Sequence, residues 1–334
     1  MASLRDIRRR IRSTQSTKQI MHAMQLVSGS KFKRAQARLL QSRQVFEFLD
    51  GLLQRVLAAA GRPERAPRSR TSRAAAPPLA QHPLMRRLDG VPDALLIVTS
   101  DTGLAGSYNT NLIQLAESEL RKETARRTQV SFIGKRGHRY FTKRGVQVME
   151  AHLNLAGRPD LQKINAIGQG LLERFLRGEV SSVRLLYAKF VSPTVSRPTV
   201  IQWLPITFGD KQQATGDKDQ QRAGVRSGQP GDSRTRKPAN RPAGFIEYPV
   251  PYIFEPSPER VFEQLLPRWT MATFQLVLLE AFTSEHGARM IAMKNATDNA
   301  QELMDALTRQ RNKIRQASIT KEISEIVGTA EALK

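Results

Sequence analysis

Apolar residues near the start of the chain recur at alternating steps of three and four over residues 3–60. This spacing predicts a coiled-coil helix over residues 1–60, because a repeat of 3.5 keeps one face towards a partner for many turns. At about 1.5 Å per residue the helix would extend roughly 80 Å, so it must lie against another long helix or inside a partner. The predicted seam consists of Leu4, Ile7, Ile11, Thr14, Lys18, Met21, Gln25, Ser28, Phe32, Ala35, Leu39, Ser42, Phe46, Leu49, Leu53 and Val56.

A matching pattern occupies the other end of the chain, over residues 258–334. Ser257 is the expected N-cap and Pro258 the first helical residue, and Pro267 should kink the helix. Small and polar residues dilute this second seam, so the two helices should be held together more loosely than two leucine-rich ones. The predicted seam consists of Leu276, Leu279, Thr283, His286, Met290, Met293, Thr297, Ala300, Met304, Leu307, Arg311, Ile314 and Ser318.

Between the two helices the pattern changes to short alternating elements. Residues 61–92, rich in Pro, Arg and Ala, predict a linker or irregular loop. In residues 93–208 the predicted strands are 94–99, 130–133, 183–190 and 199–206, and the predicted helices are 109–127, 135–145 and 161–177. Such alternation is typical of a small α/β domain with a largely parallel sheet. The expected fold class is α/β plus a long coiled coil, with a central Rossmann-like domain.

Residues 209–244 contain almost no apolar side chains and many Gly, Pro, Gln and Arg. Such a segment cannot bury enough apolar surface to offset its ordering entropy, so we predict a disordered basic insertion. Residues 245–257 then form a return segment that leads into the second long helix.

The net charge of +23 implies an anionic partner, which can be nucleic acid, anionic lipid or an acidic protein surface. The absence of cysteine excludes disulfides and thiolate catalysis. No apolar run is long enough to span a membrane, and the basic N-terminus lacks the apolar segment of a secretory signal. A bacterial-type cytoplasmic protein is the simplest interpretation.

The stretch "LLIVTSDTGLAGSYN" raises the question of catalysis, because Asp-Thr-Gly is the half-site motif of aspartic proteases. That chemistry needs two carboxylates that share a proton, and the chain has no second copy. We instead expect Asp101, Gly103 and Gly106 to shape a turn and cap the helix that follows. The loop also lacks the third glycine of a dinucleotide fingerprint and the Gly-Lys-Ser/Thr of a phosphate loop.

The histidines show no metal-ligand pairing at helical spacing. They are His22, His82, His138, His152 and His286. We therefore expect no metal, no cofactor and no catalytic residue in this chain.

The predicted N-terminal helix carries many more Arg and Lys than Asp and Glu. A run of charge is usually only a solvated helix face, but a long rod with so one-sided a balance favours an anionic partner. A basic nucleic-acid-binding helical protein remains open, although few aromatic side chains are present to stack on bases. A partner protein whose acidic surface surrounds the helix fits the charge of this helix at least as well.

The stretch "STQSTKQIMHAMQLVSGSKFKRAQ" resembles the N-terminal signature of the γ subunits of F-type ATP synthases. The C-terminal stretches "SEHGARMIAMKNATDNAQELMDAL" and "NKIRQASITKEISEIVGTAEAL" are closer still to that family, and "SDTGLAGSYNTNL" is similar to its strand–loop–helix. The similarity runs in the right order over most of the chain and leaves out residues 61–92 and 209–244.

This resemblance implies a central rotor shaft without an active site of its own. The two end helices would form an antiparallel left-handed coiled coil inside a ring of three α and three β subunits. The α/β domain would meet the ε subunit and the c-ring, so that ion flow through the c-ring turns the shaft and drives catalysis in the ring. The implied location is the cytoplasmic side of the bacterial inner membrane, peripheral through the complex, with no nucleic-acid partner.

The resemblance also implies which residues face partners. Those expected against the β subunits and their ring are Met24, Lys31, Arg34, Arg289, Arg315, Gln316, Thr320, Ile323 and Val327. Tyr252 and Glu255 lie in the segment expected to approach the c-ring or the ε subunit.

Some positions depart from the family pattern. Thr102, Ala105 and Ser107 stand where an arginine, a cysteine and a glycine are usual, and Arg311 and Ile314 replace a tyrosine and an alanine. Together with the basic insertion, these departures suggest a divergent branch, as from a variant ATPase operon. Without cysteine, the redox control of the plant chloroplast form is impossible here.

Overall fold

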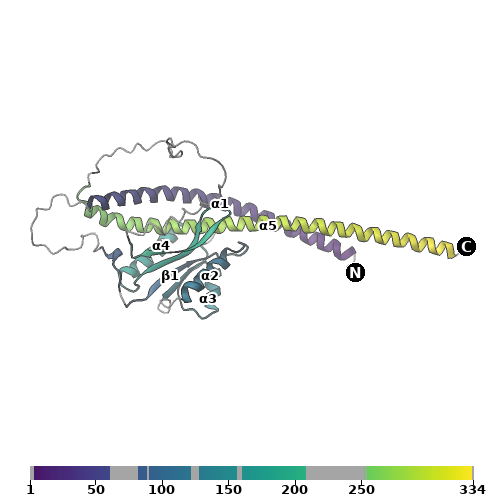
Figure 1. The fold of residues 1–334 in the computed structure, drawn as a ribbon, viewed down its shortest axis with the longest axis horizontal. Coiled ribbons are helices and arrows are strands. Elements are labelled where there is room, and N and C mark those ends of the chain that lie inside the picture. The colour runs from purple at the N-terminus through teal and green to yellow at the C-terminus, as the bar shows by residue number, and fades with distance from the viewer. Residues whose placement is uncertain are drawn as a thin grey trace, which may run out of the picture.

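The computed structural model describes residues 4–60, 82–88, 90–121, 128–155, 160–207, 252 and 254–332. Two long helices, α1 (Leu4–Ala60) and α5 (Pro258–Ala332), lie side by side, and an α/β domain packs against one side of them (Figure 1). The predicted insertion over residues 209–244 lies outside the described residues, as do most of the predicted linker and return segments.

The two long helices run antiparallel. Near one end of the pair, Trp269 Nε1 of α5 donates to Asp50 Oδ1 of α1 at 3.3 Å. Towards the other end, Lys18 Nζ of α1 donates to Gln301 Oε1 of α5. Along the axis of the pair, the residue numbers of α1 decrease in the direction in which those of α5 increase. Both ends of the chain therefore lie at the same end of the pair (Figure 1).

The predicted seams are confirmed by burial. Every seam position predicted in α1 and in α5 is buried or partly buried, and most of the positions between them in α1 are exposed. The polar seam residues Thr283 and Thr297 are satisfied locally. Each hydroxyl donates to the backbone carbonyl four residues earlier, at 2.7 and 2.8 Å. A helix seam can therefore hold these hydroxyls without leaving a buried donor unpaired.

The start of α5 follows the expected capping pattern. Ser257 Oγ accepts a hydrogen bond from the amide of Arg260 at 3.4 Å, so this serine is the N-cap as predicted. Pro267 lies inside α5, and the helix continues through it to Ala332.

The α/β domain contains a five-stranded sheet in the order β3-β2-β1-β4-β5. The strands are β1 (Asp93–Val98), β2 (Thr128–Ile133), β3 (Val148–His152), β4 (Val183–Phe190) and β5 (Ser196–Leu204). All neighbours pair in parallel except β4 and β5, which are antiparallel. The helices of this domain are α2 (Tyr108–Arg121), α3 (Lys135–Thr142) and α4 (Leu161–Leu176). The predicted Rossmann-like fold class is confirmed.

The central strand β1 is buried on both faces of the sheet. Ala94, Leu96 and Val98 join an apolar cluster with α4, α5 and the end of α1. Leu95 and Ile97 join a second cluster with α2 and α3. Because helices cover both faces, this strand is a continuous apolar run and does not alternate.

Two short elements were not predicted from the sequence. The edge strand β3 is mostly half-exposed, so its residues show neither a continuous apolar run nor a clear alternation. A 3-10 turn, η2 (Pro83–Met85), lies within the stretch predicted as linker and buries Leu84. Strand β5 begins earlier than predicted and includes Pro198, which an edge strand tolerates because one side needs no ladder hydrogen bond.

Gly134, which joins β2 to α3, should be intolerant of any side chain. Its φ is +94°, and an added Cβ would lie 2.2 Å from the carbonyl oxygen of Thr99. Gly145 has a similar φ of +75° with nothing within 4 Å, so it shares the backbone strain but not the clash. We expect Gly134→Ala to lower the free energy of unfolding by about 2 kcal/mol more than Gly145→Ala. Urea unfolding of the two purified variants measures this difference, and equal losses would contradict the assignment.

Candidate functional site

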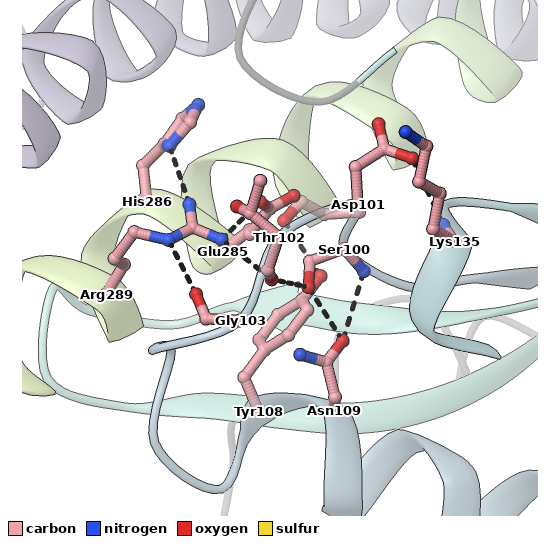
Figure 2. Close-up of polar contacts among 11 residues, drawn as sticks. Ser100, Asp101, Thr102, Gly103, Tyr108, Asn109, Lys135, Glu285, His286 and Arg289 are labelled. Atoms are coloured by element: carbon pink, nitrogen blue, oxygen red, sulfur yellow. Dashed lines mark hydrogen bonds and ion pairs between the residues drawn. The ribbon is translucent and has the colours of Figure 1, made fainter. Parts of the chain in front are cut away.

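The loop that follows β1 lies where Rossmann-like folds usually bind ligands. The chain builds β2 and β3 on one side of β1 and then β4 and β5 on the other, so the sheet order reverses between β1 and β4. Ligands of such sheets bind in the crevice at the carboxyl ends of the two strands that flank this reversal. Here α5 lies next to the loop, and its side chains enter that region (Figure 2).

Arg289 of α5 makes the central contacts (Figure 2). Its Nε donates to the carbonyl oxygen of Gly103 at 3.2 Å, and its Nη2 donates to that of Thr102 at 3.3 Å. The same Nη2 donates to Glu285 Oε1, one turn earlier in α5, at 2.8 Å. Arg289 is 7% exposed and Glu285 is 1% exposed, so this is a buried ion pair.

The loop itself is held by further hydrogen bonds. Asn109 Oδ1 accepts from the amide and the hydroxyl of Ser100, at 3.1 and 2.9 Å. Asp101 Oδ1 accepts from the amides of Lys135 and Asn154, each at 3.1 Å. Asp101 therefore caps α3, whereas the sequence led us to expect a cap on α2, the helix that follows it. The carboxylate crosses to the neighbouring loop because β1 and β2 are parallel and end side by side.

Burial shifts the pKa values of several side chains where α5 meets the loop after β1. Burial raises the pKa of Glu285, although Arg289 opposes the shift. Burial, together with the positive charges of Arg289 and Lys31, lowers the pKa of His286 to about 4. The pKa of Tyr108 lies well above its usual value, mainly because its ring is fully buried. The imidazole is therefore neutral at physiological pH, and the cation at this junction is the arginine.

A second polar link joins α5 to both α1 and the sheet. Glu280 Oε1 accepts from Arg43 of α1 at 2.7 Å, and its other oxygen accepts from the hydroxyl of Tyr187 in β4 at 3.4 Å. Burial and the neighbouring carboxylate raise the pKa of Tyr187, so its hydroxyl stays a donor. Tyr108 adds a third link, since its hydroxyl donates to the carbonyl oxygen of Ala281 at 3.2 Å.

The residues predicted to face partners fall into separate regions. On α1, Lys31 and Arg34 are exposed and Met24 is partly buried. Near the far end of α5 the predicted residues are all exposed; they are Arg315, Gln316, Thr320, Ile323 and Val327. Arg289 differs from all of these, because its guanidinium is engaged inside the chain.

The two residues predicted to approach the c-ring or ε subunit, Tyr252 and Glu255, are exposed. Tyr252 lies against the end of α1, where Arg55 donates to its hydroxyl at 2.6 Å and packs over its ring at 4.6 Å from the centroid.

Sequence analysis missed the role of Glu280, Glu285 and Arg289. The available signal was a break in helical periodicity. Residues 277–287 of α5 are all buried, although several are polar. A helix segment surrounded on every side shows no polar stripe, so its charged residues must find partners within the fold.

The described residues contain no group of three or more His, Asp or Glu side chains placed to hold a metal ion. None of the described helices has an apolar stretch long enough to cross a bilayer.

The fold, with α5 packed against the loop after β1, defines a shaft protein. Its long helix pair is held by an α/β domain, and side chains of α5 enter the crevice where Rossmann-like domains usually bind ligands. A family model described as ATP synthase matches residues 3–333. An ATP synthase gamma chain from Symbiobacterium thermophilum is 37% identical over 98% of this chain and 97% of the relative. The ATP synthase gamma chain of Moorella thermoacetica is 35% identical over the full length of both chains. The chain therefore belongs to the ATP synthase gamma chain family.

Solved structures support the fold. A chain of the Euglena gracilis mitochondrial ATP synthase rotor, rotational state 1, matches 95% of this chain and 98% of its own length with a TM-score of 0.56 and 16% identity. A chain of the OSCP/F1/c-ring structure of the same enzyme, rotational state 3, matches 99% of this chain and 94% of its own length with a TM-score of 0.57 and 18% identity. The alternative of a nucleic-acid-binding helical protein gains no support from these comparisons.

Loss of the buried cation should destabilise the chain strongly. In Arg289→Met the Glu285 carboxylate stays buried without its partner, which should lower the free energy of unfolding by about 3 kcal/mol or more. The double variant Glu285→Leu/Arg289→Met removes both charges and should stay within about 1 kcal/mol of the parent chain. Urea unfolding of the purified proteins measures both values.

The matched control is Lys321→Met, which breaks an exposed pair of the same spacing, with Glu325, on the same helix. It should cost about 0.5 kcal/mol or less. A loss in Arg289→Met as small as that of the control would show that burial of the pair has no energetic consequence.

His286 should make stability fall on mild acidification. The unfolded chain binds a proton near the ordinary histidine pKa of 6.5 and the folded chain near 4, so the unfolded state holds more protons between these values. The raised pKa of Glu285 acts in the opposite direction. Replacing His286 with Gln should therefore reduce the stability lost between pH 6.5 and 4.5 by about 1–2 kcal/mol. Urea unfolding at both pH values tests this, and parallel losses in parent and variant would refute it.

Proposed function

We propose that this chain is the central rotor subunit of an F-type ATP synthase. It couples ion flow through the c-ring to rotary catalysis in the ring of three α and three β subunits, and it carries no active site of its own. In this assignment residues 1–60 and 258–334 form the shaft, and residues 93–208 form the domain near the c-ring and ε subunit. The chain is peripheral to the cytoplasmic side of the bacterial inner membrane.

The observation that carries this proposal is the unaccompanied end of α5. Ile7, near the start of α1, is 2% exposed, but α5 continues past the point where α1 begins (Figure 1). From residue 315 to residue 329 every side chain except Ser318 is exposed. This end is roughly 20 Å long and presents Ile319, Ile323, Ile326 and Val327 to solvent. A single helix with such an apolar face gains little from standing alone in water, which supports a host that surrounds it.

The asymmetry of the shaft supplies the mechanism. Two helices of unequal length cannot present the same surface to three equivalent β subunits. Each β subunit is therefore biased towards a different conformation, and turning the shaft moves that bias from one subunit to the next. This is a shift of populations caused by differential contacts.

The proposed contacts follow from exposure. Lys31 and Arg34 present cations from α1, beside the partly buried Met24, to acidic loops of the β subunits. Arg315, Gln316 and Thr320 contact the ring near the free end of α5. There Ile323 and Val327 rotate against an apolar inner surface of the ring. Tyr252 and Glu255 face the c-ring or ε subunit. We leave Arg289 out of this set because its guanidinium is occupied within the chain.

Purification from the native membrane separates this proposal from nucleic-acid binding. A tagged chain should co-purify with α, β, ε and c subunits in a complex that hydrolyses ATP. A free basic protein that binds DNA with a steep salt dependence, and brings down no such subunits, would refute the proposal.

Gln316 and Thr320 should matter for coupling and not for folding. Both side chains are exposed on α5, and the Thr320 hydroxyl donates only to the Gln316 carbonyl at 2.9 Å. In a reconstituted complex, Gln316→Ala/Thr320→Ala should lower ATP synthesis about threefold or more, since each lost contact weakens coupling between shaft and ring.

The matched control is Thr17→Ala/Gln41→Ala. It removes the same residue types at exposed positions of α1, away from the free end of α5, and the Thr17 hydroxyl makes the same kind of backbone hydrogen bond, to the Ser13 carbonyl four residues earlier at 3.0 Å. Unchanged synthesis in the first variant, or an equal loss in both, would remove the two residues from the proposed contact set.

A further inference from the structure

The segment of α5 around Arg289 is enclosed on every side. Residues 277–287 are buried, Arg289 is 7% exposed, and exposure returns at Lys294. On one side lies α1, where an added Cβ on Gly29 would be 3.4 Å from the sulfur of Met290. On the other side lies the loop after β1. This enclosed segment therefore lies on a path by which rotation of the α/β domain can reach the far part of the shaft.

Arg289 holds two carbonyl oxygens of consecutive residues, Thr102 and Gly103, with two different nitrogens (Figure 2). The ion pair between Arg289 and Glu285 does not depend on the bonds to Thr102 and Gly103, because both charged residues lie on α5. The planar guanidinium is suited to such a fork, since its donors keep a fixed angle to one another. The contact therefore fixes the direction in which α5 faces the loop as well as its distance.

The loop can transmit this direction to the whole α/β domain. Ser100 and Asn109 tie its two ends together, and Asp101 bonds to the start of α3. Tyr108, at the start of α2, bonds to the backbone of α5. The loop is therefore a stiff connection between the sheet and the shaft.

A second set of hydrogen bonds, made by Glu280, holds α5 from the opposite side of the helix. Glu280 and Arg289 are nine residues apart, about two and a half helical turns, so their side chains leave α5 in opposite directions. Glu280 bonds to Arg43 and to Tyr187 of the sheet. Two directional contacts on opposite sides resist rotation of the helix about its own axis, whereas apolar packing alone resists it weakly.

Stability alone does not account for a buried ion pair, because apolar residues of similar volume usually stabilise a fold as well. We propose that Arg289 is a positioning residue, which fastens the loop after β1 to α5 so that the shaft and the α/β domain turn together without slip. This inference rests on the proposed rotor function. It assigns the torque-bearing contact between domain and shaft to the guanidinium and the Thr102 and Gly103 carbonyls.

The test uses the whole ATP synthase complex in membrane vesicles, carrying Glu285→Leu/Arg289→Met. This variant removes the fork without leaving a buried charge. The measured quantity is the ion uptake per ATP hydrolysed, with H⁺ and Na⁺ each assayed, together with subunit content. We expect normal assembly and a fall in this ratio of about threefold or more.

A disulfide can replace Arg289 as the link between α5 and the loop after β1, with a covalent bond in place of hydrogen bonds. An added Cβ on Gly106 would lie 3.7 Å from the Cβ of Ala292, which fits the Cβ–Cβ distance of a disulfide, and the chain has no native cysteine. Adding Gly106→Cys/Ala292→Cys to the apolar double variant should restore the ratio when oxidised, and reduction should lower it again. The same cysteine pair in the otherwise unaltered chain is the control and should leave the ratio unchanged in both redox states.

The outcomes separate the two proposals. An unchanged ratio in the apolar double variant, a fall that the oxidised disulfide does not reverse, or assembly that requires the disulfide each overturns the role of Arg289. If the unaltered chain does not assemble with α, β and c subunits at all, the proposed rotor function fails instead.

Discussion

The rest of the structure depends on the antiparallel pairing of α1 and α5. Neither helix could keep this length alone in water, because isolated helices owe little of their stability to propensity and much to packing of one apolar face. The pairing buries that face in both helices at once, from Ile7 near one end to Val56 near the other. It also places both ends of the chain at the same end of the pair, which leaves the middle of the sequence to form a separate body on one side (Figure 1).

The α/β domain uses a familiar scaffold for an unusual task. Its sheet has the order reversal at which related folds bind ligands. In this chain Arg289 approaches the loop there, and Asp101 occupies the start of α3, where an anion would otherwise find free amides. Two groups that could recognise a phosphate there, the Arg289 guanidinium and the amide of Lys135, are therefore engaged by the chain's own residues. The same geometry that suits a nucleotide in other proteins here holds a helix.

Sequence periodicity predicted the parts of the fold that repeat. The seams of both long helices and the buried strand β1 followed from spacing and apolar runs, because each depends on many residues that agree. Strand β3 did not follow, since an edge strand with half-exposed residues carries too little signal. Asp101 was correctly placed in a turn, but its partner α3 became visible only once β1 and β2 were paired. Similarly, nothing in the spacing of Arg289 indicates that its guanidinium would turn towards Thr102 and Gly103.

The burial along α5 divides the helix into stretches with different physical demands. Around residues 277–287 the helix is enclosed, and its two carboxylates, Glu280 and Glu285, are paired with arginines of the same chain, so its charges need no partner protein. Beyond residue 315 the side chains are exposed and include four large apolar residues, so this stretch is incomplete by itself. An enclosed stretch resists rotation relative to its own domain, and an exposed apolar stretch can rotate within a smooth apolar surround because no directional bond fixes its angle. In the proposed rotor, one helix would therefore combine a stretch fixed to its own domain with a stretch that turns against its host, and the change from buried polar pairs to exposed aliphatic side chains marks the transition between them.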